Sequence, residues 1–307
     1  MTRVAAVDCG TNTIKLLVAD LDRASGGQET LVREMRIVRL GQGVDATGRL
    51  SEEALARVFT ACEEYASLVA AHDVSALRFV ATSAARDAEN SADFTAGVRQ
   101  RLGVSPEVVS GDVEAQLTFD GATRSLPAVD PPVAVLDIGG GSTELIVGDA
   151  HGRVRAARSL DIGSVRLTER LMPSDPPASG EVTAAIRVVD QALDTLPSYD
   201  VHVGDAATLV GVAGTVTTMA VLLLGLRTWD HDRVHHSRFP LADVQDLAAR
   251  VLAMAVAERE AIGVPAGRSD VIGAGALILD RVLRRCRAET LTVSDADILD
   301  GIAWSLV

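Results

Sequence analysis

Two segments of the chain share one alternation of apolar and polar positions. The first runs from Val4 to Val18 and the second from Val133 to Val147, and in each an apolar run enters a polar, glycine-containing turn and leaves as a second apolar run. Short apolar runs bounded by glycine and polar residues are typical of strands joined by a tight turn. The pattern therefore predicts two β-hairpins.

These two hairpins, residues 8–20 and 137–149, align without a gap at an offset of 129 residues. The matched pairs are Asp8 with Asp137, Gly10 with Gly139, Thr13 with Ser142, Leu16 with Leu145, Val18 with Val147 and Asp20 with Asp149. A repeat of this length is too long for a solenoid and indicates a duplicated domain.

Segments with strand and helix patterns alternate through the rest of the chain, which predicts an α/β layered fold. Helices are expected at residues 51–71, 91–102, from 111 onward, 180–196, 241–262, 271–284 and 295–306, and further strands at 77–82, 156–160 and 208–212. The proline-rich residues 125–132 are the expected crossover between domains. We predict domain I at residues 1–124, joined by the C-terminal helix 295–307, and domain II at 125–294.

The composition adds limits to this picture. The 307 residues are 48% apolar and 23% charged, as in a folded protein long enough for two domains. The N-terminus lacks a leader pattern, and the longest uncharged stretch, residues 210–226, is shorter than the ~20 residues of a membrane span, so we expect no membrane partner. Three widely spaced cysteines favour a reducing cytoplasm.

The formal net charge of −13 argues against nonspecific nucleic-acid binding, which requires many cations against phosphates. An anionic substrate must therefore find local positive charge. Lys15 is the only lysine, and the remaining cations are arginines, whose planar fork suits bidentate phosphate contacts. A GC-rich genome would explain the same arginine bias.

The second hairpin turn carries three successive glycines, Gly139, Gly140 and Gly141, followed by Ser142. Without Cβ atoms, their backbone N–H groups can point into one concavity and bind phosphate oxygens. A tight hairpin alone is the alternative, but a two-residue turn needs fewer glycines. We predict a phosphate-binding loop here.

Asp137 ends an apolar strand, where an unpaired carboxylate would be costly, so a cation or a hydrogen-bonded partner is expected. Mg²⁺ is the natural candidate, although another divalent cation would serve. Glu144 could reach the same ion, because hard cations near phosphate take one or two carboxylates and keep several waters. The alternative is that Glu144 is a solvated strand residue.

The first hairpin offers hydroxyls, an amide and one glycine, and can hold a phosphate by different means. At the position of Glu144 it carries Lys15, so one copy has a basic arm and the other an acidic arm. An exposed strand lysine is the alternative for Lys15. The residues expected around phosphate in this hairpin are Asp8, Gly10, Asn12, Thr13 and Lys15.

Several candidates stay ambiguous from their own neighbourhood. Glu114 lies in the first turn of a predicted helix, where acidic residues are usually dipole partners. Arg86 follows a strand, at the sheet edge where α/β proteins bind ligands. Gly214 and Thr215 lie in a strand, glycine turn and helix start that could present N–H groups to a phosphate or serve close packing. The three histidines in residues 230–236 fit a solvated loop better than a metal motif.

Taken together, these segments resemble the exopolyphosphatase and guanosine pentaphosphate phosphohydrolase (Ppx/GppA) family, in the superfamily of acetate and sugar kinases, heat-shock chaperones and actin. The segments that carry the resemblance are residues 7–13, 81–86, 110–115, 137–144 and 211–215. The resemblance implies two ribonuclease H-like (actin-like ATPase) domains with an interdomain cleft that forms a phosphate channel.

The same resemblance assigns roles to residues. It makes Glu114 the base that activates water for attack on the terminal phosphoryl group, and Asp137 and Glu144 the ligands of Mg²⁺. It also places phosphate contacts at Gly139, Gly140, Gly141, Ser142, Asn12, Arg86 and the Gly214 turn. Positioning and charge neutralisation carry the rate in such phosphoryl transfers.

Two departures from the family pattern bear on the substrate. Val113 precedes Glu114 where members of the family often have a second acid, and the chain ends at Val307 without the helical domains of longer members. A short inorganic polyphosphate is the expected substrate. Guanosine pentaphosphate, a nonenzymatic polyphosphate or nucleotide sensor, and a sugar kinase are the alternatives. The sequence leaves open whether the chain forms a homodimer.

Overall fold

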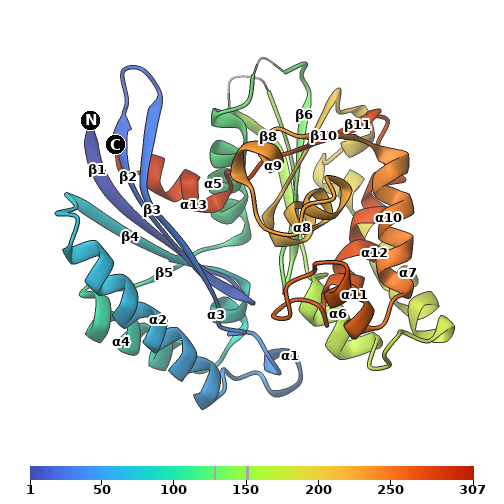
Figure 1. Cartoon of the computed structure of the whole chain (residues 1–307), viewed down its shortest axis with the longest axis horizontal. Coiled ribbons are helices and arrows are strands. Elements are labelled where there is room, and N and C mark those ends of the chain that lie inside the picture. The colour runs from blue at the N-terminus through green and yellow to red at the C-terminus, as the bar shows by residue number, and fades with distance from the viewer. Residues whose placement is uncertain (128, 150–151) are drawn as a thin grey trace. The chain divides into compact units, whose positions relative to one another are not determined.

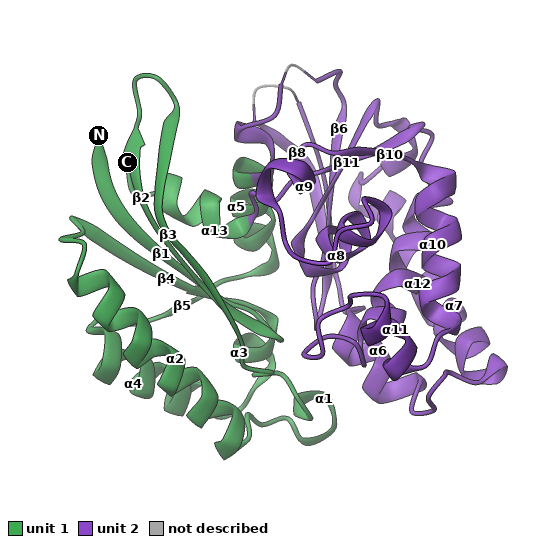
Figure 2. Ribbon diagram, in the orientation of Figure 1, with its two compact units in different colours: residues 1–121, 298–307 green, residues 122–297 purple. Residues whose placement is uncertain are grey.

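Two β-sheets organise the chain, one in each of two units (Figures 1 and 2). The computed structural model describes residues 1–127, 129–149 and 152–307. Unit 1 comprises residues 1–121 and 298–307, and unit 2 comprises residues 122–297. The domain assignment made from the sequence, and the cleft between the domains, stay predictions.

The sheet of unit 1 has the strand order β3-β2-β1-β4-β5. Strand β2 is antiparallel to both of its neighbours, whereas β1, β4 and β5 run parallel. Its strands are β1 (Thr2–Cys9), β2 (Thr13–Asp22), β3 (Gly27–Ile37), β4 (Ala76–Ala81) and β5 (Glu107–Val108), and its helices are α1 (Val44–Thr47), α2 (Glu52–Ala70), α3 (Ser83–Asp87), α4 (Ser91–Leu102), α5 (Gly111–Arg124), which continues into unit 2, and α13 (Ile298–Trp304). This order and polarity are those of a ribonuclease H-like sheet.

Period-two alternation places apolar side chains on both faces of this sheet. Ala5 and Val7 of β1 belong to one core with α2 and α4, and Val4 and Ala6 belong to a second core with α5 and α13. Figure 1 shows α2 and α4 on one side of the strands and α13 on the other. The strand β1 is therefore buried on both faces, and its carboxyl end leads directly into the first hairpin turn.

The C-terminal helix α13 is tied to unit 1 by a buried carboxylate. Arg33 Nη2 and Gln28 Nε2 donate hydrogen bonds to Asp300, which is 3% exposed, at 3.0 and 2.9 Å. Trp304 Nε1 donates to Gln28 Oε1 at 2.9 Å. Because removing one partner of a buried charge is strongly destabilising, these bonds fix the last helix to the edge strand β3.

The sheet of unit 2 has the order β10-β11-β9-β6-β7-β8. Its strands β8-β7-β6-β9 repeat the order and polarity of β3-β2-β1-β4 in unit 1. Strand β7 is antiparallel to both β6 and β8, whereas β6 and β9 run parallel. Its strands are β6 (Val133–Ile138), β7 (Thr143–Gly148), β8 (Val154–Leu160), β9 (Thr208–Val212), β10 (Arg238–Pro240) and β11 (Thr290–Val293). The predicted α/β fold with two ribonuclease H-like domains is confirmed.

Helices cover the apolar face of this second sheet. Leu136 and Leu145 of the hairpin lie in one core with Leu277 and Val251 of the helical layer. The helices are α6 (Ser164–Leu171), α7 (Ser179–Leu193), α8 (Ala213–Leu223), α9 (His231–Val234), α10 (Leu241–Ala253), α11 (Val256–Ala261) and α12 (Ile272–Leu283), with short 3₁₀ turns at Leu196–Tyr199 and Val203–Asp205. The described residues contain no helix with a continuous apolar stretch long enough to span a bilayer.

Several elements differ from the sequence-based expectations. The single helix expected at residues 241–262 is wrong: α10 and α11 are separate, because Met254 and Ala255 adopt extended backbone. The third strand of the first sheet, β3, was not predicted, because its residues are partly buried or exposed and show little alternation. The helix α6 was also missed, and it proves important for the second hairpin turn.

Candidate functional site

The first hairpin turn in unit 1 is closed by a backbone bond from Gly10 N–H to Thr13 O at 2.9 Å. Asp8 and Lys15 face each other across β1 and β2, and Lys15 Nζ lies 3.6 Å from Asp8 Oδ2. Asp8 is 5% exposed. The lysine therefore supplies positive charge beside this buried carboxylate.

The chain after β3 holds the carbonyl groups of this turn. Gly41 N–H donates to Thr11 O at 2.9 Å, and two further N–H groups, from Val38 and Arg39, donate to Asn12 O at 2.9 Å each. A Cβ on Gly41 would lie 2.3 Å from Thr11 Cγ2, so only glycine permits this approach. Among the described residues, no group accepts a hydrogen bond from the backbone N–H or from the side-chain amide of Asn12. Both donors are therefore available to a ligand.

The end of β4 brings two further candidates together. Arg86 Nη1 lies 3.0 Å from Glu114 Oε2 and donates a second bond to Val109 O at 3.0 Å. Beside them, the hydroxyls of Thr11 and Ser83 share a hydrogen bond of 2.8 Å. The first hairpin and the Glu114 pair are thus joined through the start of α3.

Burial governs the protonation of Glu114. The side chain is 7% exposed, and this desolvation raises the pKa of its carboxyl, whereas the hydrogen bond and charge of Arg86 lower that pKa. The net result is a raised pKa, because desolvation is the largest cause. A glutamate whose pKa is raised by burial is better matched to accept a proton near neutral pH than an exposed glutamate.

The second hairpin repeats the geometry of the first. Gly139 N–H donates to Ser142 O at 3.0 Å, as Gly10 does to Thr13 in unit 1. Asp137 and Glu144 face each other across β6 and β7, in the register of Asp8 and Lys15. They are 9% and 1% exposed. Directly paired residues lie on one face with Cβ atoms ~5 Å apart, so the two carboxylates are neighbours.

This acidic pair fits a Mg²⁺ ion. Ser159 Oγ donates to Glu144 Oε1 at 2.6 Å, which orients that carboxylate. The position that holds the cationic Lys15 in the first hairpin holds the acidic Glu144 in the second. Across residues 1–127, 129–149 and 152–307, no group of three potential metal ligands occurs. Two carboxylates with the rest of the shell from water and phosphate match the preference of Mg²⁺.

The start of α6 holds the carbonyl groups of the glycine turn. Ser164 N–H donates to Gly139 O at 3.0 Å, and two N–H groups, from Val165 and Arg166, donate to Gly140 O at 2.9 and 3.1 Å. A Cβ on Gly163 would lie 2.3 Å from Gly140 O, so Gly163 plays toward this turn the part that Gly41 plays toward the first.

The N–H groups of Gly140, Gly141 and Ser142 have no acceptor within the described part of the chain. No hydrogen bond of the Ser142 hydroxyl is recorded there either. These donors surround one turn that is adjacent in sequence to Asp137 and Glu144. The arrangement supports the predicted anion nest beside a metal site.

The Gly214 segment is more enclosed than expected. Gly214 and Thr215 lie in the first turn of α8, and Arg268 Nη1 donates to Gly214 O at 2.8 Å. A Cβ on Gly214 would lie 2.4 Å from that Nη1, which indicates close packing. The Thr215 hydroxyl donates to Ile138 O at 3.4 Å. Thr215 therefore braces the second hairpin and Gly214 packs against Arg268, and the contact of either residue with phosphate stays a prediction.

The three histidines form a stacked cluster in unit 2. The ring centroids of His231 and His235 are 5.1 Å apart, and those of His235 and His236 are 3.7 Å apart. His235 Nδ1 accepts a bond from Asp295 N–H at 3.0 Å, so in the neutral ring its Nε2 carries the proton. That nitrogen then has no lone pair for a metal ion.

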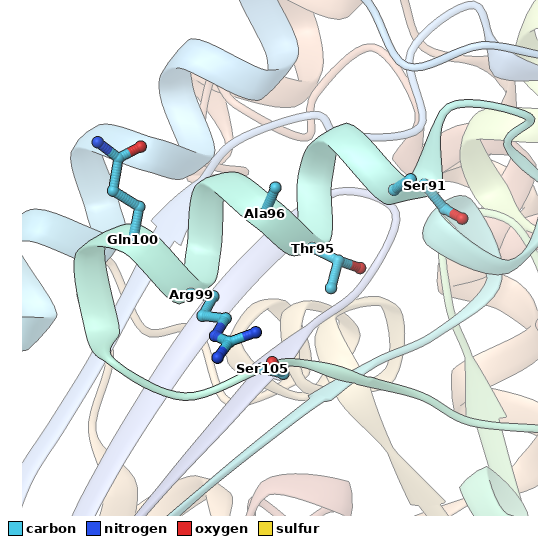
Figure 3. A pocket seen from close by; sticks show the side chains of 7 residues that line it. Ser91, Thr95, Ala96, Arg99, Gln100 and Ser105 are labelled. Carbon is cyan, nitrogen blue, oxygen red and sulfur yellow. The ribbon is translucent and has the colours of Figure 1, made fainter.

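A groove of about 660 Å³ lies along α4, away from all these residues. It is lined by Ser91, Ala92, Thr95, Ala96, Arg99, Gln100 and Ser105, and Figure 3 shows the Arg99 side chain directed toward Ser105. None of the predicted site residues lines it.

The structure thus gathers the candidates into one cluster in each unit. Unit 1 joins the first hairpin to Arg86 and Glu114, and unit 2 joins the acidic pair to the glycine turn. Sequence reasoning missed Gly41, Gly163 and Arg166. The signal that could have found the glycines is a glycine shortly after the third strand of each sheet, which becomes visible only when β3 and β8 are aligned.

Comparisons with known proteins are consistent across the chain. The model of the Ppx/GppA phosphatase family matches residues 18–307. "Exopolyphosphatase 2" of Mycobacterium tuberculosis is 45% identical over an alignment that covers 100% of this chain and 99% of that protein.

Solved structures agree with the sequence matches. A crystal structure described as an exopolyphosphatase-like protein is 40% identical, with a TM-score of 0.95 and coverage of 99% of this chain and 97% of the other. A Ppx/GppA family member from Aquifex aeolicus is 30% identical, with a TM-score of 0.83 and coverage of 99% and 97%.

Proposed function

The chain belongs to the Ppx/GppA phosphatase family, and from that premise we propose that it is a Mg²⁺-dependent exopolyphosphatase acting on short inorganic polyphosphate. The name and near-complete coverage of the Mycobacterium tuberculosis relative support this substrate. The observation that carries the proposal is the buried pair Asp137 and Glu144 beside three N–H groups without acceptors.

In this proposal the residues of unit 2 bind and orient the substrate. The N–H groups of the glycine turn and the Ser142 hydroxyl hold oxygens of the terminal phosphate. Asp137 and Glu144 would hold Mg²⁺, which neutralises phosphate charge as the bridging bond breaks. The Ser159 bond keeps the Glu144 carboxylate oriented toward its neighbour.

The proposed base lies in unit 1. Glu114 accepts a proton from water as the water oxygen bonds to the terminal phosphorus. The bridging P–O bond then breaks, its electron pair stays on the shortened polyphosphate, and orthophosphate leaves. The hydrogen bond and charge of Arg86 favour the ionised form of Glu114, and Asn12 with Lys15 is proposed to contact the anion.

The experiment uses purified protein, Mg²⁺ and polyphosphates of defined length, with orthophosphate release as the readout. We expect Glu114→Gln to lower kcat by about 10²–10⁴, because a general base acts in the transition state, and to leave polyphosphate binding nearly unchanged. Absence of release at every chain length would overturn the proposal. Binding without turnover, equal in Glu114→Gln, would indicate a sensor.

Guanosine pentaphosphate is the competing substrate, because the family includes enzymes named for it. Both substrates in one assay give a ratio of kcat/KM values, and a ratio in favour of the nucleotide would transfer the proposal to that reaction. A cytoplasmic location is also proposed, since the thiols of Cys9, Cys62 and Cys286 are free.

A further inference from the structure

The side chain of Arg166 holds one carbonyl group of the glycine turn, residues 139–142. Its Nε donates a hydrogen bond to Gly141 O at 2.8 Å, and its own backbone N–H donates to Gly140 O. The residue is half-buried at the start of α6. It therefore fixes two successive carbonyl groups of the turn, one through the backbone and one through the side chain.

The planarity of the peptide gives these bonds a consequence on the other side of the turn. In a trans peptide, the carbonyl of one residue and the N–H of the next lie in one plane and point in opposite directions. Holding the carbonyls of Gly139, Gly140 and Gly141 toward α6 therefore aims the N–H groups of Gly140, Gly141 and Ser142 away from α6.

The three peptide planes are not held alike. The carbonyls of Gly139 and Gly140 accept backbone N–H groups of α6. Among the described residues, the hydrogen bond to the carbonyl of Gly141 comes from the Arg166 side chain. A substitution of Arg166 therefore leaves the first two planes held and releases the third, which carries the N–H of Ser142.

We propose that Arg166 is a positioning residue, which fixes the Gly141–Ser142 peptide so that the Ser142 N–H points at a phosphate oxygen. The inference rests on the proposed function for the identity of the anion. The first hairpin needs no such side chain, because backbone N–H groups of Val38, Arg39 and Gly41 hold its carbonyls. The side-chain bond is a feature of the glycine turn in unit 2.

The test compares Arg166→Met, which keeps the aliphatic length and removes the donors, with Arg170→Met on the same helix. Arg170 is exposed, so its substitution controls for the lost charge. We expect Arg166→Met to lower kcat/KM about tenfold, a fraction of the ~10²–10³ that complete loss of an oxyanion donor costs. Arg170→Met should change kcat/KM less than about twofold, and Arg166→Lys should recover part of the loss.

The deciding measurement is made without turnover, in the Glu114→Gln protein labelled with ¹⁵N. Addition of Mg²⁺ and tripolyphosphate should shift the amide resonances of Gly140, Gly141 and Ser142. In the Arg166→Met variant the Ser142 response should be lost, while the glycine responses persist. Equal responses in both proteins, or an equal loss at all three amides, would overturn the proposal.

This design separates the inference from the proposed function. If the protein binds tripolyphosphate but never releases orthophosphate, the proposed reaction fails while the amide pattern still tests Arg166. If the protein turns over polyphosphate and the Ser142 amide does not respond, the reaction stands and the role of Arg166 fails.

Discussion

Removing the charge of Arg86 should move the acid limb of the pH–rate profile. This limb reports the pKa of the base in the free enzyme, which we assign to Glu114. Burial raises the pKa of Glu114 and Arg86 lowers it, so the Arg86→Met variant should have a still higher pKa at Glu114. Because the base works only when ionised, activity then disappears at a higher pH as the pH falls.

The distance between the two side chains sets the size of this displacement. At 3.0 Å, two unit charges attract by about 1.4 kcal/mol with the dielectric constant of water, and by about 5.5 kcal/mol at an effective value of 20. Arg86 is 27% exposed, so solvent screens part of the pair. The lower figure corresponds to about one pH unit, which is the minimum displacement expected.

The assay is kcat/KM for orthophosphate release from tripolyphosphate with saturating Mg²⁺, from about pH 5 to pH 9. Ionisation of the substrate is common to all variants and cancels in the comparison. Arg86→Lys retains the charge and should keep the limb near its original position. Arg101→Met is the matched control, since Arg101 is also 27% exposed and pairs with Glu63 at 2.9 Å.

An acid limb at the same pH in Arg86→Met and in the unsubstituted enzyme would refute the reasoning about Glu114. If the rate falls while the limb stays in place, the effect of Arg86 is a contact with phosphate. An equally large displacement of the limb in Arg101→Met would refute the reasoning about Glu114 as well.

Three further outcomes are expected. Asp137→Asn should raise the Mg²⁺ concentration for half-maximal rate at least about tenfold, because one of two carboxylates is lost; unchanged Mg²⁺ dependence would contradict the metal assignment. Gly41→Ala should destabilise by about 1–3 kcal/mol in denaturant unfolding, since its Cβ meets Thr11, whereas Gly180→Ala, with open space around it, should not. Burial lowers the pKa of His236, so the contribution of His236 to the free energy of unfolding is complete above pH 6.5 and declines as the pH falls below that value. Asparagine tolerates the φ of 63° at this position, and the His236→Asn variant should therefore show a smaller change in Tm between pH 7.5 and pH 5.5.

The sequence alone determined the two hairpins, because short-range alternation and turn residues specify a strand, a turn and a strand without reference to the rest of the chain. It also predicted that Glu144 could reach an ion at Asp137, and the structure pairs these two residues directly across the hairpin. The role of Glu114 came from the family resemblance, because its local sequence is that of any acidic helix start.

Only the tertiary structure decided what surrounds these turns. Arg86 proved to pair with Glu114, through a contact whose residues lie 28 positions apart. Gly41 and Gly163 became essential only through the backbones that pack against them. Arg166 gained its bond to Gly141 from the docking of α6, which no local pattern encodes. The physical reason is that periodicity specifies which face of an element is buried, whereas the partner on that face depends on the packing of segments distant in the chain.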